Sequence, residues 1–222
     1  MKKTYLLFIF ALLSFKIFAQ PSISLNPVIT GLSQPMQFIN AGDGTNRIFI
    51  PQKGGEIKVF DKNFMALGTF LTVTDITSNG ERGLLSLCFH PQYKTNGLIF
   101  VYYTNASGSL EIARYRVSGT KPNIADALSK KVVITIPHPG YSNHNGGTLR
   151  FRKDGFLYLS TGDGGGGGDP DNNGQNLNSL LGKMLRLNVN NSDTAPFYSI
   201  PTGNISGTEV LAKGLRNPFR WN

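Results

Sequence analysis

The chain is poor in several features on which common protein classes depend. Cysteine occurs once, so no intrachain disulfide can form, and the place of Cys88 in the apolar run 84–89 predicts a buried core residue. Acidic residues number 13 against 22 Lys and Arg, yet the basic residues form no run of five or more, so nucleic acid binding is not indicated. Helical periodicity is nearly absent, and only residues 175–182 predict a helical turn or two.

Long apolar runs are also missing, except at the N-terminus. Lys2 and Lys3 precede the apolar stretch 5–15, and a small residue follows at Ala19, which is the order of a secretory signal peptide. We therefore expect residues 1–19 to be cleaved and the mature protein to be secreted or periplasmic. A membrane anchor is the alternative, but the run is short for a bilayer and no later segment predicts a membrane span.

A repeated unit follows the leader. Each unit has an apolar first strand, a turn containing Asp-Gly or Asn-Gly, a β-rich second strand and a third strand. Such turns between β-rich runs are strong hairpin signals. The strands and turns of the three units cover residues 36–39, 43–44, 47–50 and 56–60; 84–89, 96–97, 98–103 and 111–117; and 148–151, 154–155, 156–160 and 183–189.

The repeat predicts an all-β protein, specifically a β-propeller of four-stranded antiparallel blades. Phe38, Phe89 and Phe151 hold matching positions 51 and 62 residues apart, a spacing typical of blades with variable loops. Residues 69–73 and 132–136 are candidate fourth strands. A β-sandwich is disfavoured because the unit repeats whole.

The number of units is too small for a closed ring. About three to three and a half blades would leave two open sheet edges. We therefore expect residues 20–222 to be an incomplete propeller domain within a longer product, with association of two halves as the alternative.

Polar residues stand directly before the first strand of each unit. Glu81, His144 and the pair Arg216-Asn217 hold this position, the last pair opening a fourth unit. Because first strands line the channel of a propeller, their entry loops meet at one end of that channel. The sequence therefore predicts that these residues share one pocket.

Each of these residues has a plausible chemical role and a simpler explanation. His144 is flanked by Asn143, Asn145 and glycines, which predicts an exposed polar loop; it is either a general base or merely solvated. Asp163 either orients that imidazole or belongs to an Asp-Gly turn. Arg216 either stabilises a developing negative charge, with Asn217 as an amide donor beside it, or is a surface arginine.

The glycine-rich segment 164–174 suggests two further sites. A P-loop is excluded because Gly182-Lys183 is followed by Met184 and lacks the upstream glycine at the required spacing. Asp169, Asp171 and Asn173 have the spacing of half a calcium loop, but Leu180 stands where a bidentate Glu is needed. A weak calcium site and a flexible loop over the pocket both remain open, and the loop is favoured.

Five segments in order resemble the glucose/sorbosone dehydrogenase family, the soluble quinoprotein sugar dehydrogenases. The resemblance covers about residues 32–221 and lies in the segments 81–91, 144–155, 161–164, 181–187 and 214–218. It implies a six-bladed propeller that oxidises an aldose to its lactone by hydride transfer to pyrroloquinoline quinone (PQQ), with calcium as a second cofactor.

The resemblance also implies roles for individual residues. His144 would be the general base on the anomeric hydroxyl and Asp163 its neighbour, while Arg216 and Asn217 would hold the carbonyl oxygens of the quinone. Glu81 stands where family members place a polar residue near substrate and cofactor. The calcium contacts and the remaining PQQ contacts of the family lie in further blades, beyond residue 222, so activity is expected of a full-length parent.

Two other classes remain open. One is a noncatalytic secreted propeller that binds a glycan or a protein partner. The other, a metal-dependent lactonase-like hydrolase, needs several channel carboxylates around a divalent ion. The presence of His144 and Arg216 in the predicted channel disfavours it.

Overall fold

The structure is a computed structural model that describes residues 22–190 and 193–222. The chain divides into two compact units, residues 1–30 and 31–222. The predicted signal peptide, residues 1–19, lies outside the described residues. Residues 22–30 of the first unit contain neither helix nor strand.

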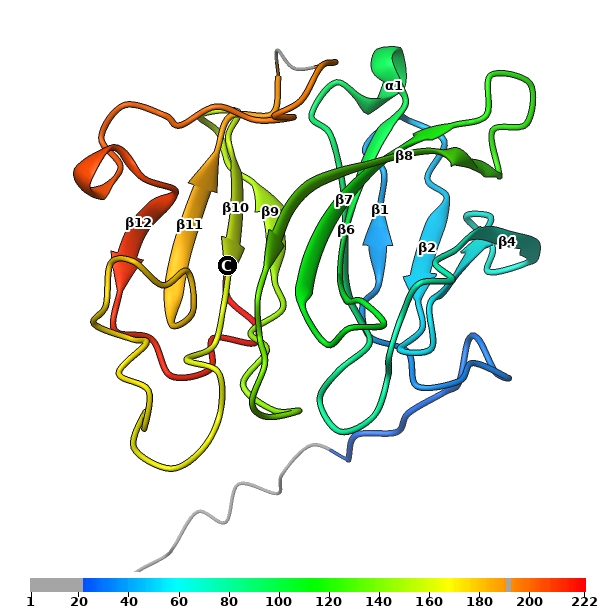
Figure 1. Cartoon of the computed structure of the whole chain (residues 1–222). Helices are drawn as coiled ribbons and strands as arrows, with labels where there is room; N and C mark the ends of the chain where they lie inside the picture. The colour runs from blue at the N-terminus through cyan, green and yellow to red at the C-terminus, as the bar shows by residue number, and fades with distance from the viewer. Residues whose placement is uncertain (1–21, 191–192) are drawn as a thin grey trace, which may run out of the picture. The chain divides into compact units, whose positions relative to one another are not determined.

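The second unit contains three four-stranded antiparallel sheets (Figure 1). Their strands are β1 (Ile39–Asn40), β2 (Ile48–Pro51), β3 (Glu56–Phe60) and β4 (Ala66–Thr72); β5 (Leu84–Phe89), β6 (Leu98–Thr104), β7 (Leu110–Val117) and β8 (Ala125–Ile136); and β9 (Leu149–Phe151), β10 (Leu157–Ser160), β11 (Lys183–Leu187) and β12 (Val210–Lys213). In each sheet the strands lie in chain order, as a propeller blade requires. The predicted all-β fold of four-stranded blades is therefore confirmed.

Several boundaries differ from the sequence-based expectation. The two candidate fourth strands are longer than predicted, and β12 was not predicted at all. The Asn96-Gly97 turn is the end of a short helix, α1 (Tyr93–Asn96), which Gly97 closes in the left-handed conformation with a φ of 64°. A second short helix is the 3-10 turn η1 (Ile205–Gly207).

The predicted helical turn at residues 175–182 is wrong. That segment contains no helix in the structure. Its main chain makes isolated turns instead, in which the amide of Asn176 donates to the carbonyl of Asn172 (3.2 Å) and the amide of Ser179 donates to that of Asn176 (3.3 Å). The ammonium of Lys183 donates to the carbonyl of Leu181 within the segment and to those of Asn173 and Gly174 before it.

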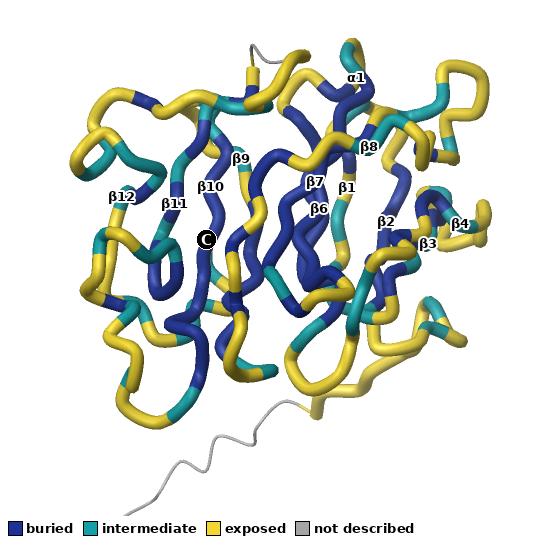
Figure 2. Tube along the Cα trace, viewed as in Figure 1, coloured by how far each residue is buried: buried dark blue, intermediate teal, exposed yellow. Residues whose placement is uncertain are grey.

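The middle sheet is buried on both faces, as Figure 2 shows for β6 and β7. Successive residues of a strand point to opposite faces. In β6, Phe100 and Tyr102 pack with β9, β10 and β11, whereas Ile99 and Val101 pack with residues of β2, β3 and β4. The uninterrupted apolar sequence of β6 follows from this double coverage.

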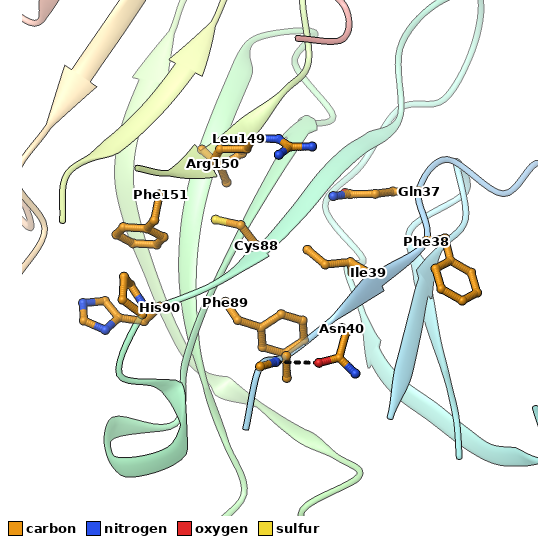
Figure 3. A pocket seen from close by; sticks show the side chains of 13 residues that line it. Gln37, Phe38, Ile39, Asn40, Cys88, Phe89, His90, Leu149, Arg150 and Phe151 are labelled. Atoms are coloured by element: carbon orange, nitrogen blue, oxygen red, sulfur yellow. Dashed lines mark hydrogen bonds between the residues drawn. The ribbon is translucent and has the colours of Figure 1, made fainter. Parts of the chain in front are cut away.

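The first strands of the three sheets flank a common cavity of about 390 Å³ (Figure 3). The three matched phenylalanines, Phe38, Phe89 and Phe151, all line it. Phe38 is 62% exposed, whereas Phe89 is buried. The predicted convergence of first strands on one channel is therefore present in the second unit.

One arginine connects all three sheets. The guanidinium of Arg220 donates hydrogen bonds to the carbonyl oxygens of Met36 (3.1 Å) before β1, Leu85 (2.9 Å) in β5 and Gly147 (3.3 Å) before β9. Burial lowers the pKa of Arg220 from its usual value.

Candidate functional site

The site is built around the side chains of His144 and Asp163. His144 lies in the loop between β8 and β9, and Asp163 lies just beyond the end of β10. The Nδ1 atom of His144 is 2.6 Å from Oδ1 of Asp163. An ionised carboxylate only accepts hydrogen bonds, so Nδ1 is the donor of this bond. Among the described residues Nε2 has no hydrogen-bond partner, so this nitrogen is available to a ligand.

The expectation that His144 lies on an exposed loop is wrong. The residue is only 3% exposed, and Asn145 and Gly146 beside it are also buried. The polar neighbours of His144 suggested solvent, but their polar groups are bound by other loops. The amide of His144 donates to Oε2 of Glu81 (2.7 Å), and the amide of Gly146 donates to Oδ1 of Asn217 (3.0 Å).

A glycine allows the His144 loop to approach β10 closely. A Cβ atom at Gly162 would lie 2.0 Å from the carbonyl oxygen of His144, far inside van der Waals contact. The loop and the strand end thus touch through their backbones. This contact, together with the bond to Asp163, fixes the imidazole from two directions.

Asp163 is itself held by several groups. Its Oδ1 also accepts a hydrogen bond from the amide of Gly165 (3.1 Å), and its carbonyl accepts one from Nδ2 of Asn173 (2.8 Å). Its amide donates to the carbonyl of Arg216 at 2.8 Å. The carboxylate is therefore oriented before any ligand binds.

Arg216 borders the same region with an unpaired positive charge. The residue is exposed, and its guanidinium makes no hydrogen bond or ion pair with any described residue. Together with Asp163, Asp169 and Gln175 it lines a cavity of about 200 Å³. An unpaired guanidinium beside a histidine–aspartate pair can bind an anion or an oxygen that gains negative charge.

Glu81 and Asn217 line a second cavity of about 370 Å³. Its other lining residues include Lys53, Gly146 and Phe219. Nδ2 of Asn217 donates to Oε2 of Glu81 at 3.1 Å. Hydrogen bonds thus connect Glu81, His144, Asp163, Asn217 and the backbone of Arg216, but the two cavities share no lining residue and His144 lines neither. The chemical roles of these residues stay predictions.

Sequence reasoning missed two buried residues near the site. Lys183 is completely buried and donates to three loop carbonyls, and burial lowers its pKa. His138 is buried too, with Nε2 3.4 Å from the carbonyl oxygen of His144. A lysine inside an apolar strand is a readable signal for Lys183. His138 has no comparable signal, because only the fold brings it to His144.

In the glycine-rich segment, the carboxylate of Asp169 binds the main chain of its own loop. Both carboxylate oxygens of Asp169 accept main-chain hydrogen bonds at 2.8 Å, from Asn173 and Gly174. Among residues 22–190 and 193–222, no group of three or more His, Cys, Asp or Glu side chains could hold a metal ion. Within the same residues, no helix has the length and apolar composition to cross a bilayer.

Comparison with known proteins relates this chain to sugar dehydrogenases and to Hedgehog-interacting protein. Hedgehog-interacting protein of Mus musculus is 34% identical over 220 residues, covering 89% of this chain and 31% of that protein. Quinoprotein glucose dehydrogenase B of Acinetobacter calcoaceticus is 25% identical over 222 residues, covering 86% and 44%. The chain therefore spans less than half the length of these relatives.

A solved structure supports the same relationship. The PQQ-bound form of aldose sugar dehydrogenase from Streptomyces coelicolor matches with a TM-score of 0.71 and 28% identity, over 87% of this chain and 54% of that one. The profile of the family described as Glucose / Sorbosone dehydrogenase matches residues 32–220, nearly the whole second unit. The chain therefore belongs to the glucose/sorbosone dehydrogenase family.

Proposed function

We propose that the full-length product containing this chain oxidises an aldose to its lactone with PQQ as hydride acceptor. The observation that carries the proposal is the buried pair of His144 and Asp163, 2.6 Å apart, beside the unpaired guanidinium of Arg216. A base, its orienting carboxylate and a fixed cation form a set that suits hydride removal from an alcohol. The membership of the family and the PQQ-bound relative support the cofactor.

His144 is the proposed general base. Its Nε2 accepts the proton of the sugar's anomeric hydroxyl, because Nδ1 is already bonded to Asp163. Asp163 keeps the ring in this tautomer and stabilises the imidazolium that forms. The hydrogen bond that it accepts from Gly165 and the one that its amide donates to the carbonyl of Arg216 hold it still while the charge on the ring changes.

Arg216 and Asn217 are the proposed contacts to the carbonyl oxygens of the quinone. The guanidinium is free, and Asn217 has one Nδ2 hydrogen beyond the one given to Glu81. Glu81, through its other carboxylate oxygen, is proposed to face the cofactor and sugar in the 370 Å³ cavity. When bound, PQQ supplies a two-electron acceptor for the hydride.

The residues present fit one side of such a cofactor. A cation, an amide donor and a proton acceptor suit the quinone carbonyls, but the described residues offer no cluster for the calcium ion. We propose that calcium and the remaining PQQ contacts come from beyond residue 222.

Substitution of the base and the cation separates their roles. His144→Ala should lower kcat of sugar oxidation by roughly two to four orders of magnitude while PQQ affinity changes little. Arg216→Ala should lower kcat and also weaken PQQ binding, because it removes a charge partner of the cofactor. PQQ binding is followed by absorbance titration and turnover with a dye acceptor. Wild-type turnover in the His144 variant would overturn the proposal.

The similarity to Hedgehog-interacting protein favours a second function, binding of a protein partner without redox chemistry. This alternative predicts that the full-length product neither binds PQQ in a titration nor oxidises any aldose in the presence of PQQ and calcium. The same two measurements therefore decide between the functions.

A further inference from the structure

One carboxylate oxygen at the site holds two loops at once. Oε2 of Glu81 accepts hydrogen bonds from the amide of His144 (2.7 Å) and from Nδ2 of Asn217 (3.1 Å). The amide of Glu81 in turn donates to the carbonyl of Ser142 at 3.2 Å. The loop before β5 is thus tied both to the loop that carries His144 and to the segment after β12.

The side-chain oxygen of Asn217 binds the His144 loop as well. Its Oδ1 accepts a hydrogen bond from the amide of Gly146 at 3.0 Å. The side chains of Glu81 and Asn217 therefore form a single bridge, which we call the Glu81–Asn217 brace. It binds the main chain of the His144 loop at two points, His144 and Gly146.

The brace acts on His144, the proposed general base. His144 has a left-handed backbone with a φ of 55°, which a non-glycine residue rarely adopts without support. Asp163 fixes the rotation of the ring, but it does not fix the Cα atom from which the ring extends. The hydrogen bonds to Glu81 and Asn217 do so, because they hold the main chain on both sides of that atom.

We propose that Glu81 and Asn217 act together as positioning residues for His144. The main function of Glu81 is then to accept these two hydrogen bonds, and its negative charge is dispensable. For its kinetic consequence the inference rests on the proposed sugar oxidation. Its structural part can be measured in the protein without cofactor.

The geometry separates the acceptor role of Glu81 from its charge, because both donors meet the same oxygen, Oε2. In Asn217→Asp two carboxylates face each other and Oε2 of Glu81 loses its side-chain donor, so the brace should open. In Glu81→Gln the amide oxygen can still accept both hydrogen bonds. In the double variant Glu81→Gln/Asn217→Asp, the amide oxygen would face the new carboxylate and the amide nitrogen would face the amide of His144, so the brace should stay open.

The test compares these three variants in the full-length protein at pH 7 and low salt. Asn178→Asp is the control for the added charge, because Asn178 is exposed and its side chain makes no hydrogen bond with the described residues. The readouts are the NMR resonances of the His144 ring and the Tm of the cofactor-free protein, followed by kcat with PQQ.

We expect Asn217→Asp to shift the His144 resonances and to lower kcat roughly tenfold to a hundredfold, as misplacement of a base does. Glu81→Gln should retain the wild-type His144 resonances and Tm, whereas the double variant should shift the resonances as Asn217→Asp does. His144 resonances shifted as far in Glu81→Gln as in Asn217→Asp, or wild-type resonances in Asn217→Asp, would overturn the inference. Since the resonances need no turnover, failure of the proposed sugar oxidation would be seen separately.

Discussion

At the scale of single residues, the site depends on places where the backbone of one loop touches another. His144 lies in a left-handed conformation, and its carbonyl oxygen is directed at Gly162. Any side chain at position 162 would occupy the space of that carbonyl. The smallest side chain in the sequence is thus required for the position of the imidazole.

Replacement of Gly162 by Ala should therefore displace His144. The new Cβ would lie 2.0 Å from the carbonyl oxygen of His144, so the loop must move. We expect kcat of the full-length protein to fall roughly 100-fold, since displacements near 1 Å have effects of this size. Gly167→Ala, with no atom within 4 Å of the added carbon, is the matched control. Equal kcat in both variants would contradict the argument.

The sequence was informative about these residues only in part. Residue types and spacing indicated His144, Asp163 and Arg216, because strand ends in a repeated unit can be located from turns. They did not indicate that His144 is buried. Its burial results from Gly162, Glu81 and Asn217, which reach it from three distant segments.

At the scale of secondary-structure elements, His90 connects the end of β5 to α1 and to the third sheet. Its Nδ1 accepts hydrogen bonds from the amide of Gln92 (3.0 Å) and from Nδ2 of Asn96 (2.8 Å), and its Nε2 donates to Oδ1 of Asn190 (2.9 Å). The ring must be neutral to make this set. Burial, and to a smaller extent the charge of Arg114, lower the pKa of His90 from 6.5.

This lowered pKa predicts a dependence of stability on pH. The unfolded chain binds a proton at a higher pH than the folded protein does, so the free energy of unfolding should decrease as pH falls below about 6.5. One group contributes at most about 1.4 kcal/mol per pH unit. Urea unfolding between pH 8 and pH 5 measures the slope, and His90→Gln should reduce it. An unchanged slope in that variant would exclude His90 as its source.

The elements show which local signals are reliable. Asp154-Gly155 and Asp43-Gly44 marked hairpins correctly, because these pairs favour the positive φ of tight turns. Residues 175–182 form isolated turns and no helix, and their local sequence does not distinguish a single turn from a short helix. β12 was missed because its only partner strand, β11, lies more than twenty residues earlier.

At the scale of the whole molecule, the three sheets share their apolar faces. The middle sheet contributes residues to both cores, so it cannot keep its apolar surface covered without its two neighbours. The apolar strands, the Gly-containing turns and the blade repeat were readable from the sequence. The convergence of the loops followed from the fold class, whereas the hydrogen bonds among them could not be derived.

The N-terminal residues 1–19 predict that the product is cleaved and exported. Its basic, apolar and small residues stand in the order that signal peptidases recognise, so we expect cleavage after Ala19 and a secreted or periplasmic protein beginning at Gln20. Mass spectrometry of the exported protein from a bacterial host gives its first residue. An intact leader on the exported product would contradict this expectation, and Ala19→Arg serves as an uncleaved control.

The hydrogen bonds of Arg220 depend on how the three sheets are oriented relative to one another. A guanidinium is planar and rigid, and this one bonds to a carbonyl in β5 and to carbonyls in the segments that lead into β1 and β9. Tilting one sheet against the others should therefore lengthen at least one of these bonds. The exchange rate of a single labelled side chain would therefore record the mutual orientation of all three sheets.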